Sequence, residues 1–424
     1  MKKIKQIINN PLFSGSAIMI LGSNGASALN YIYHFVVGRM LGPAKYGELT
    51  ALISLIGLFG VISLGLSLSV TKYVSSTKDI ADVNNLNSWL KRKFFTFFVL
   101  FTVIILFLSP SIASFLNMEN TGNVMLIALL FLFSFSSGIN RAILQGLLKF
   151  KQIIISILLE NGLKLLISVL LIILGFQVGG AVMGFVLASI FGWFLTSYFL
   201  KSNNTKDPKK PEGLNKIVYF TIPVMIQSLA ITSFYTTDVI LVKHFFSSYE
   251  AGLYASISTL GRIIFFATSP ISAVMFPIIS QRLSKGVRFE KIFFYSLLAT
   301  VFLSGLIIIF YGLFPQLAIN LLYGSAYLES AHLLGLFGIF MTLFSISSLY
   351  INYGLSLGKT KIVFFPAAAA LIQVVIIWFN HQSLEEVVLI SIVTASLLLL
   401  SLIIYSKVRF SYGNNTSLNN SSSL

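Results

Sequence analysis

The sequence predicts an all-α polytopic membrane protein with about twelve transmembrane helices, and three observations support this fold class. The 424 residues are 56% hydrophobic and only 10% charged, whereas soluble domains carry about 25% charged residues. The mean hydropathy of the chain is +0.89. The apolar residues also form long runs, as a membrane-spanning helix of about 20 apolar residues requires. Together these properties exclude an ordinary soluble protein of several domains.

The apolar runs place the predicted helices in order along the chain. The first run continues to Val37, which is too long for the core of a signal peptide, so we expect it to be retained as the first helix. Polar or basic segments separate the later runs. The predicted spans are 12–37, 48–71, 94–116, 122–148, 153–175, 178–200, 217–241, 251–280, 292–314, 328–357, 362–379 and 384–405.

The positions of the basic residues predict the orientation of these helices. A net charge of +16 could indicate nucleic-acid binding, but 23 of the 29 lysines and arginines fall in loops on one side of the membrane when the loops alternate. The opposite side holds only Arg39, Lys45 and Lys243. Cytoplasmic loops of membrane proteins carry such an excess of positive charge. We therefore expect both termini in the cytoplasm, a location in the cell membrane, and no nucleic-acid partner.

The composition divides the chain into two lobes, a linker and a tail. The polar segment KSNNTKDPKKP near the midpoint predicts a cytoplasmic linker over 201–216. This linker separates an N-terminal six-helix lobe, 1–200, from a C-terminal six-helix lobe, 217–405. The polar residues that end the sequence predict a disordered cytoplasmic tail over 406–424.

A similar turn follows the first helix of each lobe. The segments RMLGPAKYGELTALISL (39–55) and HFFSSYEAGLYASISTL (244–260) each contain an outer-side turn, a glycine and a helix rich in small and hydroxyl residues. Because each lobe has an even number of helices, both lobes enter the membrane from the same side. This arrangement predicts a parallel pseudo-repeat with a central cavity between the lobes near the midplane.

Charged residues inside the predicted spans are candidates for function, because charges are costly in a bilayer. Arg262 lies near the midplane with no acidic residue within four positions. It either pairs with a group on another helix or binds substrate in the cavity, where a guanidinium suits phosphate. Arg141 lies about 12 Å from the cytoplasmic end of its helix, so it either extends to the interface or faces the cavity.

The remaining interior charges also allow two interpretations each. Glu160 precedes Lys164 by four residues, a spacing that favours an ion pair; the alternative is a cation or proton site at Glu160. Asp238 lies near the outer end of its helix, as a helix-end acid or as a coupling-ion site. The candidate substrate-binding residues are therefore Arg262, Arg141 and Lys164, and the candidate ion-coupling residues are Asp238 and Glu160.

Patterns for catalysis, cofactors and metals are missing from the sequence. Gly358-Lys359-Thr360 looks like the end of a phosphate-binding loop, but Tyr353 occupies the position that requires glycine. The four histidines are scattered and there is no cysteine. We therefore expect a transporter and not an enzyme, with no cofactor and no metal.

Three groups of residues, in the same order along the chain, resemble a known family. They are Gly38-Arg39-Met40-Leu41-Gly42-Pro43 with Tyr46-Gly47, Leu144-Gln145-Gly146 with Lys149-Phe150-Lys151, and Asp238 with Gly252-Leu253-Tyr254. The chain is similar over nearly its whole length to the polysaccharide flippases, the Wzx-type O-antigen and capsule flippases. These belong to the multidrug/oligosaccharidyl-lipid/polysaccharide exporter superfamily.

The resemblance implies a V-shaped pair of lobes and the export of a lipid-linked oligosaccharide by alternating access. The implied partners are an undecaprenyl-diphosphate-linked oligosaccharide, the lipid bilayer, and H⁺ or Na⁺ as the driving ion, with the protein acting as a monomer. One alternative is a multidrug or small-solute exporter of the same superfamily, which would favour an acidic cavity. The other is a membrane polysaccharide polymerase or ligase, which usually carries a large outer loop that this sequence lacks.

Overall fold

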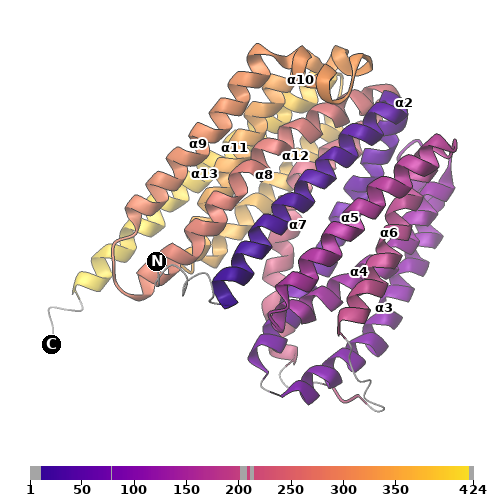
Figure 1. Ribbon diagram of the computed structural model, residues 1–424. Helices are drawn as coiled ribbons and strands as arrows, with labels where there is room; N and C mark the ends of the chain where they lie inside the picture. Colours follow the sequence, from indigo (N-terminus) through magenta and orange to yellow (C-terminus); the bar gives the residue numbers. More distant parts are fainter. Residues whose placement is uncertain (1–10, 78, 201–207, 211–213, 420–424) are drawn as a thin grey trace, which may run out of the picture. The chain divides into compact units, whose positions relative to one another are not determined.

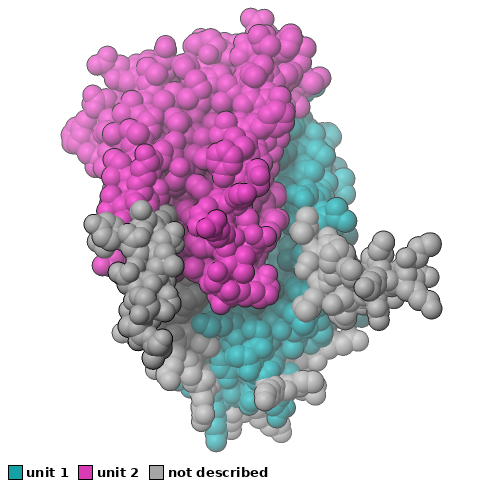
Figure 2. Space-filling model, turned by 90° about the vertical axis from the view of Figure 1, so that its left-hand side faces the viewer, with its two compact units in different colours: residues 1–228 teal, residues 229–424 magenta. Residues whose placement is uncertain are grey.

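The computed structural model describes residues 11–77, 79–200, 208–210 and 214–419, and all regular structure in these residues is helical (Figure 1). Eleven of the described helices are long and apolar enough to cross a membrane. The predicted fold class, an all-α polytopic membrane protein, is therefore confirmed. The chain forms two compact units, residues 1–228 and 229–424, which Figure 2 shows in teal and magenta. Most of the predicted linker, 201–216, lies outside the described residues.

The first helix, α2 (Pro11–Ser76), reverses its direction at Gly42. Gly42 has φ 73° and ψ 171°, a conformation that glycine adopts easily because it has no Cβ. His34 Nδ1 lies 3.0 Å from the Tyr46 hydroxyl, whereas residues twelve apart in a straight helix are separated by about 18 Å. Helix α2 therefore contains the first two predicted crossings, and the eleven helices make twelve crossings.

In the first unit, α2 packs against the hairpin of α4 (Thr121–Gly146) and α5 (Phe150–Ile173). The arm of α2 before Gly42 runs along α5, where Gly22 abuts Ile154. The arm after Gly42 runs along α4, where the Ser67 hydroxyl donates a hydrogen bond of 3.3 Å to the Gly138 carbonyl. Because α4 and α5 are antiparallel, these contacts also make the two arms of α2 antiparallel.

Two further helices complete the first unit. Helix α3 (Ile80–Phe115) begins well before the predicted span 94–116, because the Asp79 side chain caps its polar first turn by accepting a hydrogen bond of 2.9 Å from the Ala81 amide. Helix α6 (Gln177–Leu200) packs closely against α4 and α5. Its small residues permit this, since small side chains let membrane helices approach one another.

The second unit contains the end of α7 and the helices that follow it. Their bounds are α7 (Leu214–Phe245), α8 (Ser248–Ser284), α9 (Glu290–Leu313), α10 (Pro315–Leu322), α11 (Ala331–Ser356), α12 (Phe364–Phe379) and α13 (Leu384–Asn419), with 3₁₀ turns η1 (Ser325–Ser330) and η2 (Thr360–Val363).

Helix α8 packs against α9 and α11 in this unit. A capping box of Ser247 and Glu250 starts the helix, and Gly261 allows α11 to approach so closely that Phe337 lies where a Cβ would stand. The short helix α10 and η1 occupy the segment predicted as a loop between two spans. Helix α13 continues to Asn419, so this part of the expected disordered tail, 406–424, is helical.

Candidate functional site

The second unit buries one carboxylate in its core. Asp238 on α7 is only 1% exposed. The Tyr254 hydroxyl on α8 donates a hydrogen bond of 2.8 Å to Asp238 Oδ2, and the Val239 amide donates one of 2.9 Å to Asp238 Oδ1. A buried carboxylate requires such donors, because leaving it without partners in an apolar medium is very costly. The structure therefore holds Asp238 inside the unit and not at an exposed helix end.

Arg262 lies one helix away and interacts with this carboxylate through charge. Its guanidinium is close enough to Asp238 for an electrostatic interaction, and its Cζ lies 5.5 Å from the centre of the Tyr235 ring. Its Nε and Nη2 atoms are buried and have no hydrogen-bond partner in the described residues. Part of the arginine's charge is thus balanced by an acid on another helix, while two of its nitrogens remain unsatisfied, at a cost of about 1–3 kcal/mol each.

The first unit contains an ion pair between two helices. Arg141 on α4 pairs with Glu160 on α5, and both side chains are 21% exposed. Arg141 Nε also donates a hydrogen bond of 3.0 Å to the Ser156 hydroxyl. Gly192 on α6 makes room for the pair, because a Cβ at this position would overlap the Glu160 carboxylate.

This ion pair corrects the expected pairing of Glu160 with Lys164. The Lys164 side chain is 6% exposed, and its Nζ donates a hydrogen bond of 2.8 Å to Asn30 Oδ1. The same Nζ lies 4.8 Å from the centres of the Tyr33 and Phe185 rings. Lys164 thus hydrogen-bonds to α2 while Glu160 pairs with α4, and the direct partner of each charge is on another helix and not within α5.

Arg141 also lines a cavity of about 410 Å³ within the first unit. The cavity lies between the two arms of α2, α4 and α5, and its polar lining includes Ser63, Ser67, Ser134 and Gln145. Arg141 therefore borders a cavity inside its own unit, and its position at the central cavity between the lobes stays a prediction. Hydroxyl and amide groups beside a cation can hydrogen-bond a polar ligand or ordered water.

The sequence singled out the charged residues but not their uncharged partners. Asn30, Tyr33 and Phe185 surround Lys164, and Tyr235 lies beside Arg262. Only Tyr254 carried a signal, since it lies in one of the motifs that resemble the flippases. Among the described residues, no group of three or more histidine, cysteine, aspartate or glutamate side chains is placed to hold a metal ion.

Comparison with known proteins identifies related sequences. The family model described as "Polysaccharide biosynthesis protein" matches residues 36–332. An uncharacterized membrane protein of Methanocaldococcus jannaschii, MJ1375, is 25% identical over 374 residues, which cover 82% of this chain and 86% of that protein. Both similarities extend across the two units and all five candidate residues.

Several solved structures share this fold at low sequence identity. An inward-facing multidrug resistance MATE family transporter of the MOP superfamily superposes with a TM-score of 0.76 at 14% identity, covering 92% of this chain and 96% of the other. The lipid II flippase MurJ in an inward closed conformation gives 0.73 at 14% identity, with 92% and 87% covered. A MOP superfamily transporter from Pyrococcus furiosus gives 0.61 at 17% identity, with 97% and 98% covered.

Proposed function

The chain belongs to the polysaccharide biosynthesis protein family, as its resemblance to polysaccharide flippases predicted, and from this membership we propose that it is a membrane exporter of lipid-linked oligosaccharide. The substrate we propose is an undecaprenyl-diphosphate-linked oligosaccharide, moved from the cytoplasmic to the outer leaflet for the synthesis of a cell-surface polysaccharide. Alternating access driven by H⁺ or Na⁺ is the mechanism, and the proposed location is the cell membrane with both termini in the cytoplasm.

The observation that carries this proposal is the unsatisfied guanidinium of Arg262. Within the described part of the chain, two of its nitrogens are buried without hydrogen-bond partners, in a helix long enough to span the membrane. A diphosphate that leaves water for the interior of a membrane protein needs positive charge and donors to offset the loss of its hydration. Arginine supplies both in a planar arrangement that matches phosphate oxygens. An anionic lipid headgroup is therefore the substrate class that fits this residue best.

The other candidate residues take supporting roles in this proposal. Arg141 lines the 410 Å³ cavity and supplies a second cation for substrate, with Glu160 as its counter-ion. The Lys164 ammonium is enclosed by Asn30 and two aromatic rings. To bind substrate, it would have to exchange its hydrogen bond to Asn30 for one to the substrate. Asp238 and Glu160 are the proposed coupling sites, because each carboxylate already contacts a group that would respond to its protonation or to a bound cation.

A multidrug or small-solute exporter is the second candidate function. The fold similarity to MATE family transporters favours it, whereas the family membership favours the oligosaccharide substrate. Cationic drugs would require acidic residues without counter-ions, and both Asp238 and Glu160 have a basic residue close by. A polysaccharide polymerase or ligase is less well supported, since the fold is similar to that of transporters and flippases.

Transport in proteoliposomes tests the proposal directly. The purified protein is reconstituted with a fluorescently labelled polyprenyl-diphosphate oligosaccharide, and the label accessible to an impermeant quencher is followed over time. We expect the protein to accelerate the exchange of this lipid between leaflets relative to protein-free vesicles. Transport of a cationic dye together with no acceleration for the glycolipid would instead establish the multidrug exporter.

A further inference from the structure

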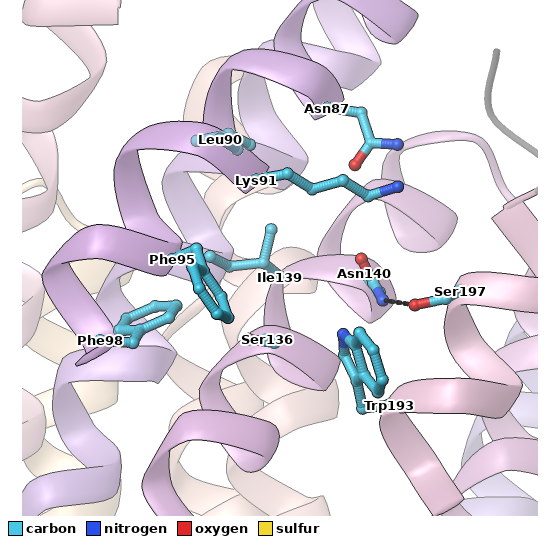
Figure 3. A pocket seen from close by; sticks show the side chains of 10 residues that line it. All are labelled: Asn87, Leu90, Lys91, Phe95, Phe98, Ser136, Ile139, Asn140, Trp193 and Ser197. Carbon is cyan, nitrogen blue, oxygen red and sulfur yellow. Dashed lines mark hydrogen bonds between the residues drawn. The ribbon is translucent and has the colours of Figure 1, made fainter. Parts of the chain in front are cut away.

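A second cavity, of about 320 Å³, lies between α3, α4 and α6 of the first unit (Figure 3). It has a polar side and an apolar side. Figure 3 shows the Asn87 amide and the Lys91 ammonium on the same side as the Asn140 and Ser197 pair, and Phe95 on the opposite side. The cavity shares none of its lining with the five residues proposed for transport. Its amphipathic lining requires a separate explanation.

Asn87 is the residue in this cavity that most needs a partner. Its side chain is 2% exposed, and neither Nδ2 nor Oδ1 has a hydrogen-bond partner among the residues that the structure describes. Burying an amide without hydrogen bonds costs free energy. Native structures therefore rarely contain one unless a water or a ligand supplies the missing hydrogen bonds. The two atoms require different partners, because Nδ2 donates and Oδ1 accepts. A ligand that satisfies Asn87 must therefore carry both an acceptor and a donor.

Lys91 adds a positive charge next to this amide. It follows Asn87 by one helical turn on α3, so the two side chains share a face. Lys91 is exposed at the cavity, and no acidic side chain pairs with it in the part of the chain that the structure describes. Arg92 and Lys93 follow directly in the sequence. The polar side of the cavity thus favours an anion.

Two aromatic side chains of the lining are exposed, Phe95 across from the polar groups and Trp193 beside Asn140 and Ser197. Phe95 on α3 is 55% exposed and Trp193 on α6 is 39% exposed. Asn140 lies about 9 Å before the end of α4, and Ser197 about 5 Å before the end of α6. A cavity one or two turns inside the helix ends lies at the depth of lipid headgroups, where tryptophan is enriched in membrane proteins.

We propose that this cavity binds the headgroup of an anionic glycerophospholipid from the surrounding bilayer. The lipid phosphate accepts hydrogen bonds from Lys91 and from Asn87 Nδ2, and a hydroxyl of the headgroup donates to Asn87 Oδ1. The acyl chains follow the exposed faces of Phe95 and Trp193. Basic pockets between membrane helices on the cytoplasmic side are suited to such headgroups. The site provides the exporter with a resident lipid, distinct from its transported substrate.

Fluorescence quenching by brominated lipids tests this site, because Trp193 lines it. The chain has 3 tryptophans, so Trp89→Phe and Trp378→Phe leave Trp193 as the only one. The protein is reconstituted in vesicles in which brominated phosphatidylglycerol, or brominated phosphatidylcholine, replaces the unbrominated lipid stepwise. We expect Trp193 to be quenched at lower mole fractions of phosphatidylglycerol, since phosphatidylcholine has neither net charge nor a free hydroxyl. Equal quenching by the two lipids would overturn the proposal.

Matched variants in the same background assign the preference to residues. Lys91→Gln should weaken the preference for phosphatidylglycerol about fivefold, whereas Arg92→Gln, on the neighbouring position outside the cavity, should leave it unchanged. Asn87→Leu should also weaken it without loss of thermal stability, because leucine removes the unsatisfied amide. An unchanged preference in Lys91→Gln would overturn the site. Release of brominated phosphatidylglycerol by equimolar polyprenyl phosphate would overturn it in favour of a substrate entry point.

Discussion

The hydroxyl of Tyr254 on α8 donates a hydrogen bond of 2.8 Å to the carboxylate of Asp238 on α7, and both side chains are buried. Hydrogen bonds to an ionised group contribute about 1.5–3 kcal/mol, roughly twice the value of a bond between neutral groups. Tyr254 therefore fixes the position of the carboxylate that also interacts with Arg262. The hydrogen bond therefore links α7 to α8 beside Asp238, the proposed coupling residue, which interacts electrostatically with Arg262, the proposed substrate-binding residue.

Removal of the Tyr254 hydroxyl should destabilise the protein. We expect Tyr254→Phe to lower the free energy of unfolding by about 1.5–3 kcal/mol, because the buried carboxylate loses a donor. Tyr311→Phe is the matched control, since the Tyr311 hydroxyl donates a hydrogen bond of 2.9 Å to the neutral Leu260 carbonyl. Unfolding in detergent, followed by helical circular dichroism, compares the two. Equal losses would show that Asp238 does not depend on this bond.

Removal of the Arg262 guanidinium should block transport. A charge-assisted contact with phosphate contributes about 1.5–3 kcal/mol, so Arg262→Ala should weaken substrate binding roughly ten- to a hundredfold. Arg262→Lys should recover only part of the loss, because an ammonium cannot form the bidentate contact. Glycan export is measured at equal amounts of protein in the membrane. Arg282→Ala, an exposed arginine at the end of the same helix, serves as control. Full export by Arg262→Ala would show that this arginine does not bind substrate and serves only to balance the charge of Asp238.

Neutralisation of a coupling acid should separate transport from its driving ion. If Glu160 or Asp238 binds the cation, Glu160→Gln or Asp238→Asn should abolish the dependence of transport on the ion gradient while substrate binding is largely kept. Glu250→Gln, in the capping box of α8, is a control outside the proposed sites. Transport is measured in proteoliposomes with imposed H⁺ and Na⁺ gradients. Wild-type ion dependence in both single variants would remove these two acids from the mechanism.

The approach of α8 to α11 should not tolerate an added methyl group. Gly261→Ala places a Cβ on the Phe337 ring, and overpacking of this kind costs about 1–3 kcal/mol. Gly305→Ala on α9 meets no atom within 4 Å, so alanine's higher helix propensity should stabilise that variant by about 0.5–1 kcal/mol. Thermal unfolding of the two variants should therefore shift in opposite directions. A loss of stability in both would point to a cause other than packing.

The proposed topology places the linker and the C-terminus on the same side. With twelve crossings, reporter fusions after Lys209 and after the last residue should both report the cytoplasm. A fusion in the segment between α11 and α12 should do the same, whereas one at Lys45 should report the outer side. An outer-side signal from the C-terminal fusion would contradict the parallel pseudo-repeat.

The sequence predicted the crossings well because their signals are local. Gly42 and Pro43 are turn residues, and the apolar runs have the length that a bilayer requires. The partners of the interior charges could not be predicted in the same way. The spacing of Glu160 and Lys164 favours a pair, yet Glu160 binds Arg141, which lies 19 residues away. That choice depends on how α4, α5 and α6 are rotated and on the space at Gly192.

The sequence also could not predict which buried polar groups would lack hydrogen-bond partners. An asparagine such as Asn87 in a polar segment carries no signal that distinguishes a solvated amide from a buried one. Arg262 was identified by its depth, but its contact with Tyr235 depends on side-chain direction. Periodicity places a residue on a helix and at a depth, whereas the neighbours that decide its chemistry come from other helices.

The reversal at Gly42 bears on the order of events during biosynthesis. Because the two arms of α2 form a hairpin, they can leave the translocon as one unit and partition into lipid together. The tip between them carries Arg39 and Lys45, whose transfer across the bilayer interior costs about 2.5–3.5 kcal/mol for each charge on an insertion scale. If one arm inserts alone, only the insertion free energy of that arm offsets this cost. If the hairpin inserts as a unit, the insertion free energies of both arms offset it. Early synthesis of both arms therefore commits the chain to its orientation before the first candidate cation, Arg141, has left the ribosome.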